Sequence, residues 1–121
     1  MLNVEPRWSM LPVVPLAWLA ITRSNQESER AKLFRILDWR TLIGREVGRS
    51  HVKLGDPKVG RQHAAVRFEN TADSDAPQFV LYDLASTNGT KLNGKRISAP
   101  RVLEDGDHIA VGATELVFKR A

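Results

Sequence analysis

The sequence predicts an all-β fold, a two-sheet β-sandwich of many short, mainly antiparallel strands with ligand loops at one end. Three observations indicate this class. Short apolar or alternating stretches recur along the 121 residues, and turn residues separate them at short intervals. No window keeps a helical apolar period beyond about 8 residues. Asn93-Gly94 lies between two strand-like stretches, and Asn-Gly is a strong hairpin signal because a type I′ turn needs positive φ at both central residues.

The expected strands are the apolar stretches between turn signals. Residues 64–69 illustrate the pattern, since Ala64, Val66 and Phe68 alternate with polar or small side chains. Turns are expected at Asp105-Gly106-Asp107 and at Gly112-Ala113. In chain order, the expected strands are residues 16–23, 32–37, 40–43, 51–54, 64–69, 78–84, 91–92, 95–97, 101–103, 108–111 and 115–120.

The remaining segments define the boundaries of the domain. Residues 24–30 and 70–77 are polar loops, and the best helical pattern, at 28–37, has strand-like sequence on both sides, which argues against a helix. Residues 1–15 are interrupted by prolines and lack periodicity. We therefore expect an N-terminal arm, residues 1–15, followed by one β-sandwich domain, residues 16–121.

Composition narrows the classes of function. The chain has 18 Lys+Arg against 14 Asp+Glu, a net charge of +4, and its basic residues are spread along the sequence. This charge balance does not decide whether the partner is a phosphoprotein, a nucleic acid or neither. It has no cysteine, which excludes disulfides, zinc–thiolate sites and thiol nucleophiles. The longest apolar run, 10–21, is interrupted by Pro12 and Pro15 and is shorter than the ~20 residues of a membrane span. We expect a cytoplasmic protein with no cofactor, metal or membrane partner.

Three loop segments next to expected strands carry the candidate chemistry: Gly44-Arg45, Gly60-Arg61-Gln62-His63 and Ser86-Thr87-Asn88-Gly89-Thr90. A guanidinium offers a planar, permanently charged fork that matches phosphate oxygens. The hydroxyls and the asparagine amide add neutral donors, and the glycine that follows the asparagine permits close backbone approach. Together they form a donor set suited to a phosphate monoester.

The order of these segments resembles the forkhead-associated (FHA) domain family over residues 16–119, almost the whole chain. The resemblance implies a β-sandwich that recognises phosphothreonine in partner proteins. Arg45 would then bind the phosphate, and Arg61 would contact the peptide backbone or the phosphate. Thr87 would bind the phosphate or adjacent backbone, and Asn88 would bond the peptide backbone beside the phosphothreonine. His63 would brace the loops.

The stretches that support the resemblance are Leu42-Ile43-Gly44-Arg45, Gly55-Asp56-Pro57, Val59-Gly60-Arg61-Gln62-His63-Ala64, Ser86-Thr87-Asn88-Gly89-Thr90 and Leu103-Glu104-Asp105-Gly106-Asp107. Gly44 and Gly89 would support the loops together with the histidine. The implied partner is a phosphothreonine-containing protein, such as a Ser/Thr kinase or its substrate.

Gly60 departs from the family pattern, which usually has a serine whose hydroxyl bonds the phosphate. A hydrogen bond to a charged group contributes about 1.5–3 kcal/mol, so its loss weakens binding by about 10- to 150-fold. The Gly60 N–H or a water would soften that loss. The expectation is weakened phosphothreonine binding or a pocket with another use.

Two cations are expected at the rim of the site. In similar domains the position of Lys58 helps to choose the side chain three residues after the phosphothreonine, which predicts a preference for Asp or Glu there. Arg49 is a second rim candidate, on the loop after Arg45.

Three other readings stay open at this point. An interaction module that ignores phosphate would self-associate through the N-terminal arm, which carries Trp8, followed by Trp18 at the start of the domain. Nucleic-acid binding is suggested by the pI of about 9.9, but no zinc finger, RNA-binding aromatic signature or basic helix is present. Catalysis would need Ser86, His63 and Asp83 as a triad, a combination that arises by chance in many domains.

Overall fold

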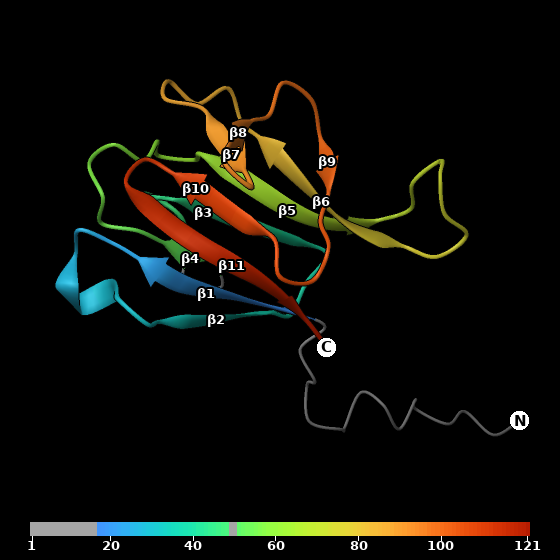
Figure 1. The fold of residues 1–121 in the computed structure, drawn as a ribbon, viewed down its shortest axis with the longest axis horizontal. Coiled ribbons are helices and arrows are strands. Elements are labelled where there is room, and N and C mark those ends of the chain that lie inside the picture. The colour runs from blue at the N-terminus through green and yellow to red at the C-terminus, as the bar shows by residue number, and fades with distance from the viewer. Residues whose placement is uncertain (1–16, 49–50) are drawn as a thin grey trace, which may run out of the picture.

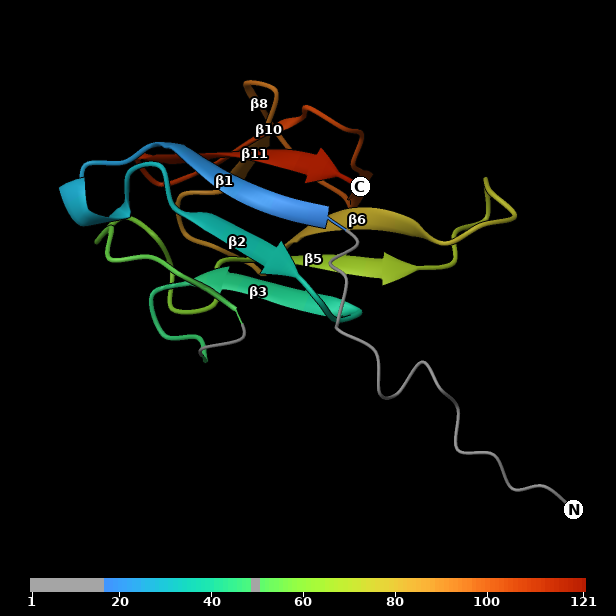
Figure 2. The same ribbon diagram turned by 90° about the horizontal axis from the view of Figure 1, so that it is seen from below.

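The computed structural model describes residues 17–48 and 51–121, and within these ranges the chain forms eleven β-strands and one 3-10 turn, Glu27–Glu29. Figure 1 shows the strands as two stacked layers, and Figure 2 shows the same layers from below. The strands are β1 (Ala17–Arg23), β2 (Leu33–Ile36), β3 (Arg40–Gly44), β4 (Val52–Lys53), β5 (Ala64–Glu69), β6 (Gln78–Asp83), β7 (Thr90–Leu92), β8 (Lys95–Arg96), β9 (Arg101–Val102), β10 (His108–Val111) and β11 (Thr114–Arg120).

The two layers are a six-stranded sheet in the order β2-β1-β11-β10-β7-β8 and a five-stranded sheet in the order β4-β3-β5-β6-β9. Neighbouring strands are antiparallel except β3 and β4, which pair in parallel. The predicted all-β, mainly antiparallel sandwich is therefore confirmed.

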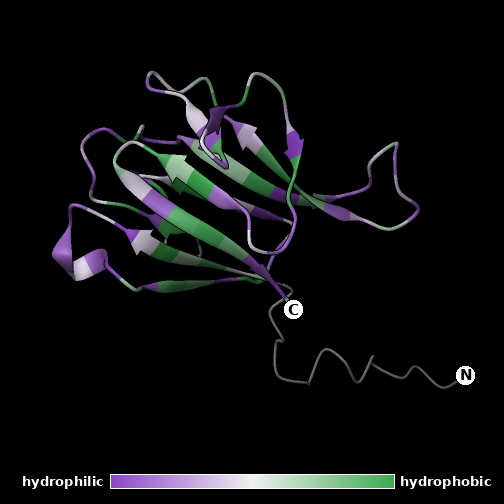
Figure 3. Ribbon diagram, viewed as in Figure 1, coloured by the Kyte–Doolittle hydropathy of each residue, from purple (hydrophilic) through white to green (hydrophobic). Residues whose placement is uncertain are grey.

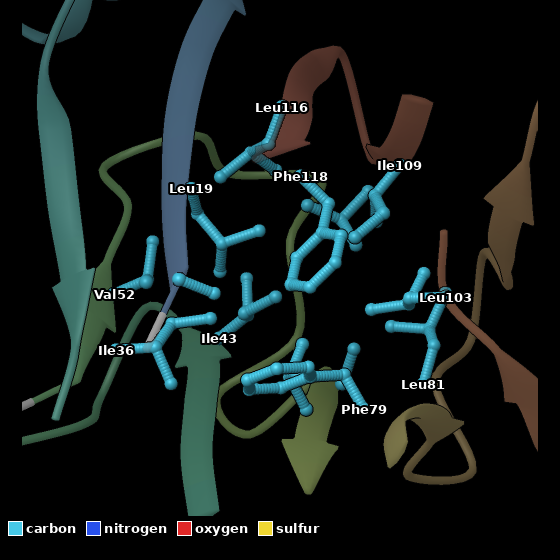
Figure 4. Packing of buried hydrophobic residues seen from close by; sticks show 14 of the residues in the cluster. Leu19, Ile36, Ile43, Val52, Phe79, Leu81, Leu103, Ile109, Leu116 and Phe118 are labelled. Atoms are coloured by element: carbon cyan, nitrogen blue, oxygen red, sulfur yellow. The ribbon is translucent and has the colours of Figure 1, made fainter. Parts of the chain in front are cut away.

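Alternation along the strands creates the core between the layers. In β11, Leu116 and Phe118 are fully buried, while Glu115 and Lys119 point to the other side of the sheet. The ring of Phe118 meets that of Phe79 from the opposite sheet, with centroids 5.1 Å apart. Figure 4 shows the aliphatic side chains of both sheets converging on these rings, and Figure 3 shows hydrophobic residues along the strands and hydrophilic ones in the loops.

The Asn93-Gly94 hairpin is confirmed. Both residues have positive φ, 51° and 85°, as a type I′ turn requires. The Asn93 side chain also fixes the neighbouring strand: its Nδ2 donates to Asp107 at 3.0 Å, and its Oδ1 accepts the N–H of His108 at 2.9 Å.

Differences from the predicted elements lie at their ends. Strands β4, β8 and β9 are each two residues long, shorter than predicted, because only two residues of each pair with a neighbouring strand. Within the helical pattern of residues 28–37, Leu33–Ile36 pair with β1 as β2. The predicted N-terminal arm, residues 1–15, lies outside the described residues. Among the described residues, no helix has the length and apolar character of a membrane span.

Candidate functional site

Backbone hydrogen bonds join the loop after β3 to the loop before β5. The N–H of Arg45 donates to the carbonyl of Gly60 at 3.0 Å, and the N–H of Glu46 donates to that of Arg61, also at 3.0 Å. Gly44 makes this approach possible, because a Cβ on it would lie 2.2 Å from the Arg61 carbonyl oxygen. Two arginines predicted to contact the ligand therefore lie on adjoining loops.

The backbone carbonyls of two consecutive residues position the side chain predicted to bind the phosphate and the side chain predicted to bind the peptide backbone. Arg45 donates through Nε to the carbonyl of Val59, and Asn88 donates through Nδ2 to the carbonyl of Lys58 at 2.9 Å. The half-buried Arg45 side chain thus has one nitrogen tied to the protein. Among the described residues no acceptor binds its two terminal nitrogens, which form the fork that an oxyanion requires.

His63 is fully buried at the base of the site and connects two loops. Its Nδ1 accepts the N–H of Gly60 at 2.9 Å, and its Nε2 lies 2.8 Å from the carbonyl of Gly89. A carbonyl only accepts and a backbone N–H only donates, so the imidazole is neutral with its proton on Nε2. The expectation that the Gly60 N–H turns toward an anion is wrong, because His63 holds that group.

Asp56 anchors the loop before β5 to the other sheet, a role that the sequence analysis missed. It is fully buried and accepts the N–H of Lys58 at 2.9 Å, the N–H of Ala113 at 2.7 Å and the hydroxyl of Thr114 at 3.1 Å. The available signal was the Asp-Pro pair at the start of the loop, which is typical of a side chain that caps its own turn. This carboxylate ties the rim residue Lys58 to the turn between β10 and β11.

Asp83 organises the loop that carries the asparagine turn. Its carboxylate accepts hydroxyl hydrogen bonds from Ser86 and Thr90, at 2.5 Å and 2.7 Å, and the N–H of Ser86 at 3.2 Å. Partial burial raises its pKa, but the hydrogen bonds from Ser86 and Thr90 outweigh burial, and the pKa of Asp83 is lowered. The Ser86 hydroxyl is thus bound to a carboxylate.

The same contacts argue against the Ser–His–Asp arrangement. Ser86 bonds Asp83 directly, whereas both ring nitrogens of His63 are bonded to the backbone of other residues. A triad needs the histidine between the serine and the aspartate. The three residues occupy separate parts of the loop framework.

The cations of the rim are exposed. Arg61 lies 3.7 Å from the carboxylate of Glu46, with side-chain exposures of 76% and 63%. Lys58 and Thr87 are also exposed, and Arg49 lies outside the described residues. The structure thus brings Arg45, Gly60, Arg61, Lys58 and Asn88 together, with Thr87 beside Asn88, while their contacts with a ligand stay predictions.

The position of Gly60 has room for a side chain. A Cβ there would lie 3.5 Å from His63 Nδ1, an ordinary contact distance, and Gly60 does not have a positive φ. No steric requirement for glycine exists at this position, in contrast to Gly44.

Sequence relatives match a large part of this chain. The mouse protein named angiogenic factor with G patch and FHA domains 1 is 41% identical over 83 residues, which cover 63% of this chain and 11% of that protein. The transcriptional regulatory protein EmbR of Mycobacterium tuberculosis is 33% identical over 76 residues, which cover 60% of this chain and 18% of EmbR. The chain therefore corresponds to a small part of the length of these relatives.

Solved structures share the fold. One from a study of phosphothreonine-dependent FHA domain interactions superposes with a TM-score of 0.67 at 26% identity, covering 87% of this chain and 96% of that one. EmbR in complex with a low-affinity phosphopeptide gives a TM-score of 0.69 at 25% identity, covering 88% of this chain and 25% of that one. The sequence pattern of the FHA domain matches residues 41–112, which include every described site residue. The chain belongs to the FHA domain family, whose members are phosphothreonine-binding modules.

Proposed function

We propose that this chain binds phosphothreonine in partner proteins through the site formed by the loops after β3, before β5 and after β6. The observation that supports it most directly is the pair of carbonyls on Lys58 and Val59, which place Asn88 and Arg45 side by side. An oxyanion-binding fork and a backbone-binding amide thus flank one short segment.

The mechanism follows from charge and from rigid positioning. A phosphothreonine carries about −1.5 to −2 charge at neutral pH. Arg45 supplies the charge-assisted contact, and Arg61 exchanges its exposed contact with Glu46 for the phosphate or the peptide backbone. Thr87 adds a hydroxyl donor, and Asn88 uses its remaining amide groups on the peptide backbone.

Gly60 sets the strength of this binding. It has no hydroxyl for the phosphate, and its N–H is held by His63. The Ser86 hydroxyl is also engaged, by Asp83. We therefore propose a phosphothreonine reader that is weaker than one with serine at position 60, with water as the remaining substitute donor.

The decisive experiment is a calorimetric titration with phosphothreonine peptides from a library, beside threonine and phosphoserine controls, for the wild type and Arg45→Ala. We expect phosphate-dependent binding that Arg45→Ala weakens by at least about tenfold. Arg35→Ala, an exposed arginine on β2, is the matched control and should leave binding unchanged. Equal binding of phosphorylated and unphosphorylated peptides would contradict the proposal.

The biological setting is part of the same proposal. We infer binding rather than catalysis, a cytoplasmic location, and a partner that is a Ser/Thr kinase or a kinase substrate. Support for the partner comes from the phosphopeptide bound to EmbR and from the fact that a kinase is needed to produce a phosphothreonine. A pull-down with the wild type and Arg45→Ala, before and after phosphatase treatment of the lysate, tests this setting.

A second candidate function is self-association that does not depend on phosphate, through the N-terminal arm. Three apolar side chains near the β2 edge favour it: Leu33, Leu37 and Trp39 are 60%, 47% and 57% exposed. Ala17, the first described residue, pairs with Ile36 at the end of β2, beside this surface. Sedimentation equilibrium should give a dimer that Trp39→Ser dissociates and Arg45→Ala preserves. A monomeric wild type would rule this role out.

A further inference from the structure

Charged residues form a row across the outer face of the six-stranded sheet, at the end that carries the loops. Direct cross-strand pairs join Arg96 to Lys91, Lys91 to Ala110, Ala110 to Glu115 and Glu115 to Arg23. Directly paired residues project from the same face of a sheet. The flanking residues Ile109 and Leu116 are buried in the core, so this row faces outward.

A hollow of about 440 Å³ lies on this row. The small residue Ala110 lies between Lys91 and Glu115 across the strands, and Gly94 and Gly112 also line the hollow. Lys58 and Asn88 also line it, so the hollow adjoins the proposed phosphothreonine site.

Gly112 explains why the two sites are continuous. A Cβ on it would lie 2.9 Å from Asp56 Oδ2 and 3.1 Å from the carbonyl carbon of Lys58. Glycine therefore lets the Lys58 loop pack against the turn between β10 and β11. That contact joins the rim of one sheet to the outer face of the other.

The charge of the hollow is unbalanced. Arg23, Lys58 and Lys91 line it as cations, and Glu115 is its single lining carboxylate among the described residues. Glu115 is already engaged: it accepts from Arg23 at 3.1 Å and lies 2.9 Å from His108 Nδ1. The Arg23 side chain is 73% exposed, and such a pair contributes little, so Arg23 can turn to another anion at small cost.

We propose that this hollow is a second anion subsite, which takes an acidic group from the peptide whose phosphothreonine occupies the first site. The group is an Asp or Glu carboxylate or a second phosphate. Lys91 and Arg23 are its specificity residues, contributed by β7 and β1 rather than by the phosphothreonine loops. This inference rests on the proposed function, because the shared wall of Lys58 and Asn88 is what directs one peptide into both sites.

The first test compares phosphothreonine peptides that are identical except for one flank, which is neutral, has two aspartates, or carries a second phosphothreonine. Both flanks are tried, and dissociation constants come from fluorescence anisotropy. For the wild type we expect an acidic flank to tighten binding by about threefold to tenfold, and added salt to reduce that gain. A larger gain for the phosphate than for the aspartates identifies phosphate as the group, and an equal gain identifies carboxylates.

Substitutions distinguish an effect of the hollow on peptide affinity from an effect of the overall positive charge of the domain. Lys91→Gln should abolish the gain, and Lys91→Glu should reverse it in favour of a lysine flank. Lys119→Gln is the matched control, since Lys119 projects from the same face of β11, four residues from Glu115, and pairs with Asp105 at 3.6 Å. A gain that Lys91→Gln and Lys119→Gln change equally, or no gain in the wild type, overturns the proposal.

The second test does not depend on phosphothreonine. An unphosphorylated peptide with four consecutive aspartates is titrated into the labelled wild type and followed by amide chemical shifts. We expect saturable shifts at Lys91, Ala110 and Gly112, absent in Lys91→Gln. If these amide shifts do not change, the subsite proposal is wrong even if the domain binds phosphothreonine. If they change but the domain does not bind phosphothreonine, only the proposed function is contradicted. Tighter binding of a DNA duplex than of every peptide, lost in Lys91→Gln, would assign the hollow to nucleic acid instead.

Discussion

His63 accepts a hydrogen bond from the backbone N–H of Gly60 at 2.9 Å through Nδ1. The histidine therefore holds the residue at which the sequence of the site differs from the usual family pattern. The same ring reaches the Gly89 carbonyl through Nε2, at 2.8 Å. Two loops that carry predicted ligand contacts are therefore bonded to one buried side chain.

Replacing this histidine should lower the stability of the domain. His63→Ala leaves the Gly60 N–H and the Gly89 carbonyl without a partner and opens a cavity, so we expect a loss of about 2–4 kcal/mol in the free energy of unfolding. Urea denaturation measures it. Gln62→Ala, an exposed neighbour, should change stability by less than about 0.5 kcal/mol. If the two substitutions lowered the free energy of unfolding equally, His63 would not be the residue that stabilises these loops.

Gly60→Ser should tighten phosphothreonine binding. The added hydroxyl supplies the missing donor, and a Cβ at this position makes only an ordinary contact, 3.5 Å from His63 Nδ1. We expect the dissociation constant to fall by about 10-fold or more, with unfolding free energy nearly unchanged. Calorimetry with phosphorylated and unphosphorylated peptides checks it, and a gain shared by both peptides would show that the hydroxyl does not act on the phosphate.

Gly44→Ala should disrupt the junction of the two arginine loops. The new Cβ would lie 2.2 Å from the Arg61 carbonyl oxygen, so the backbone has to separate, at a cost of about 2 kcal/mol or more. Gly48→Ala, in the loop that follows β3, is the matched control, since the nearest atom to a new Cβ there is His51 Cδ2 at 3.8 Å. Thermal unfolding compares them, and a stable Gly44→Ala would refute the close approach.

Asp83 should make the protein sensitive to acid. Its pKa is lowered in the folded state from the ordinary value of 3.8, because hydrogen bonds from Ser86 and Thr90 outweigh its partial burial. Its contribution to stability is therefore present above the unfolded pKa and is lost as the pH falls through the lower folded one. Unfolding midpoints measured from about pH 2 to 7 should fall less steeply at the acid end for Asp83→Asn. Parallel curves would contradict this linkage.

Asp56→Asn should loosen the attachment of the Lys58 loop. The carboxylate accepts from three donors, and an amide would direct its own N–H at one of them. We expect a loss of about 2–3 kcal/mol and faster hydrogen exchange at the Lys58 and Ala113 amides. Asp75→Asn, in the exposed β5–β6 loop, should leave exchange at both amides unchanged.

Much of the fold could be predicted from local patterns. Strands β5 and β10 match their predicted bounds, because alternation and flanking turn residues fix them locally. The Asn93-Gly94 turn is specified by its own backbone requirements. The ends of β4, β8 and β9 could not be predicted, since they depend on how many residues of each pair with a neighbouring strand in the folded chain.

The site was predictable as a set of residues but not as a network. Arg45 and Asn88 stand out by type and context, yet their positioning by the carbonyls of Val59 and Lys58 depends on loops that approach only in the folded chain. The engagement of the Gly60 N–H by His63 reversed one expectation for the same reason. Asp56 was missed because two of its three partners, Ala113 and Thr114, lie 57 and 58 residues away in the sequence.

The two buried polar anchors, His63 and Asp56, have a consequence for how binding free energy is distributed. Because they fix the loops before any ligand arrives, the domain loses little conformational entropy on association, and the ordering penalty falls on the peptide. Affinity should therefore respond more to the stiffness of the ligand than to that of the domain. A peptide held extended by proline or by cyclisation is expected to gain affinity here without making a single new contact.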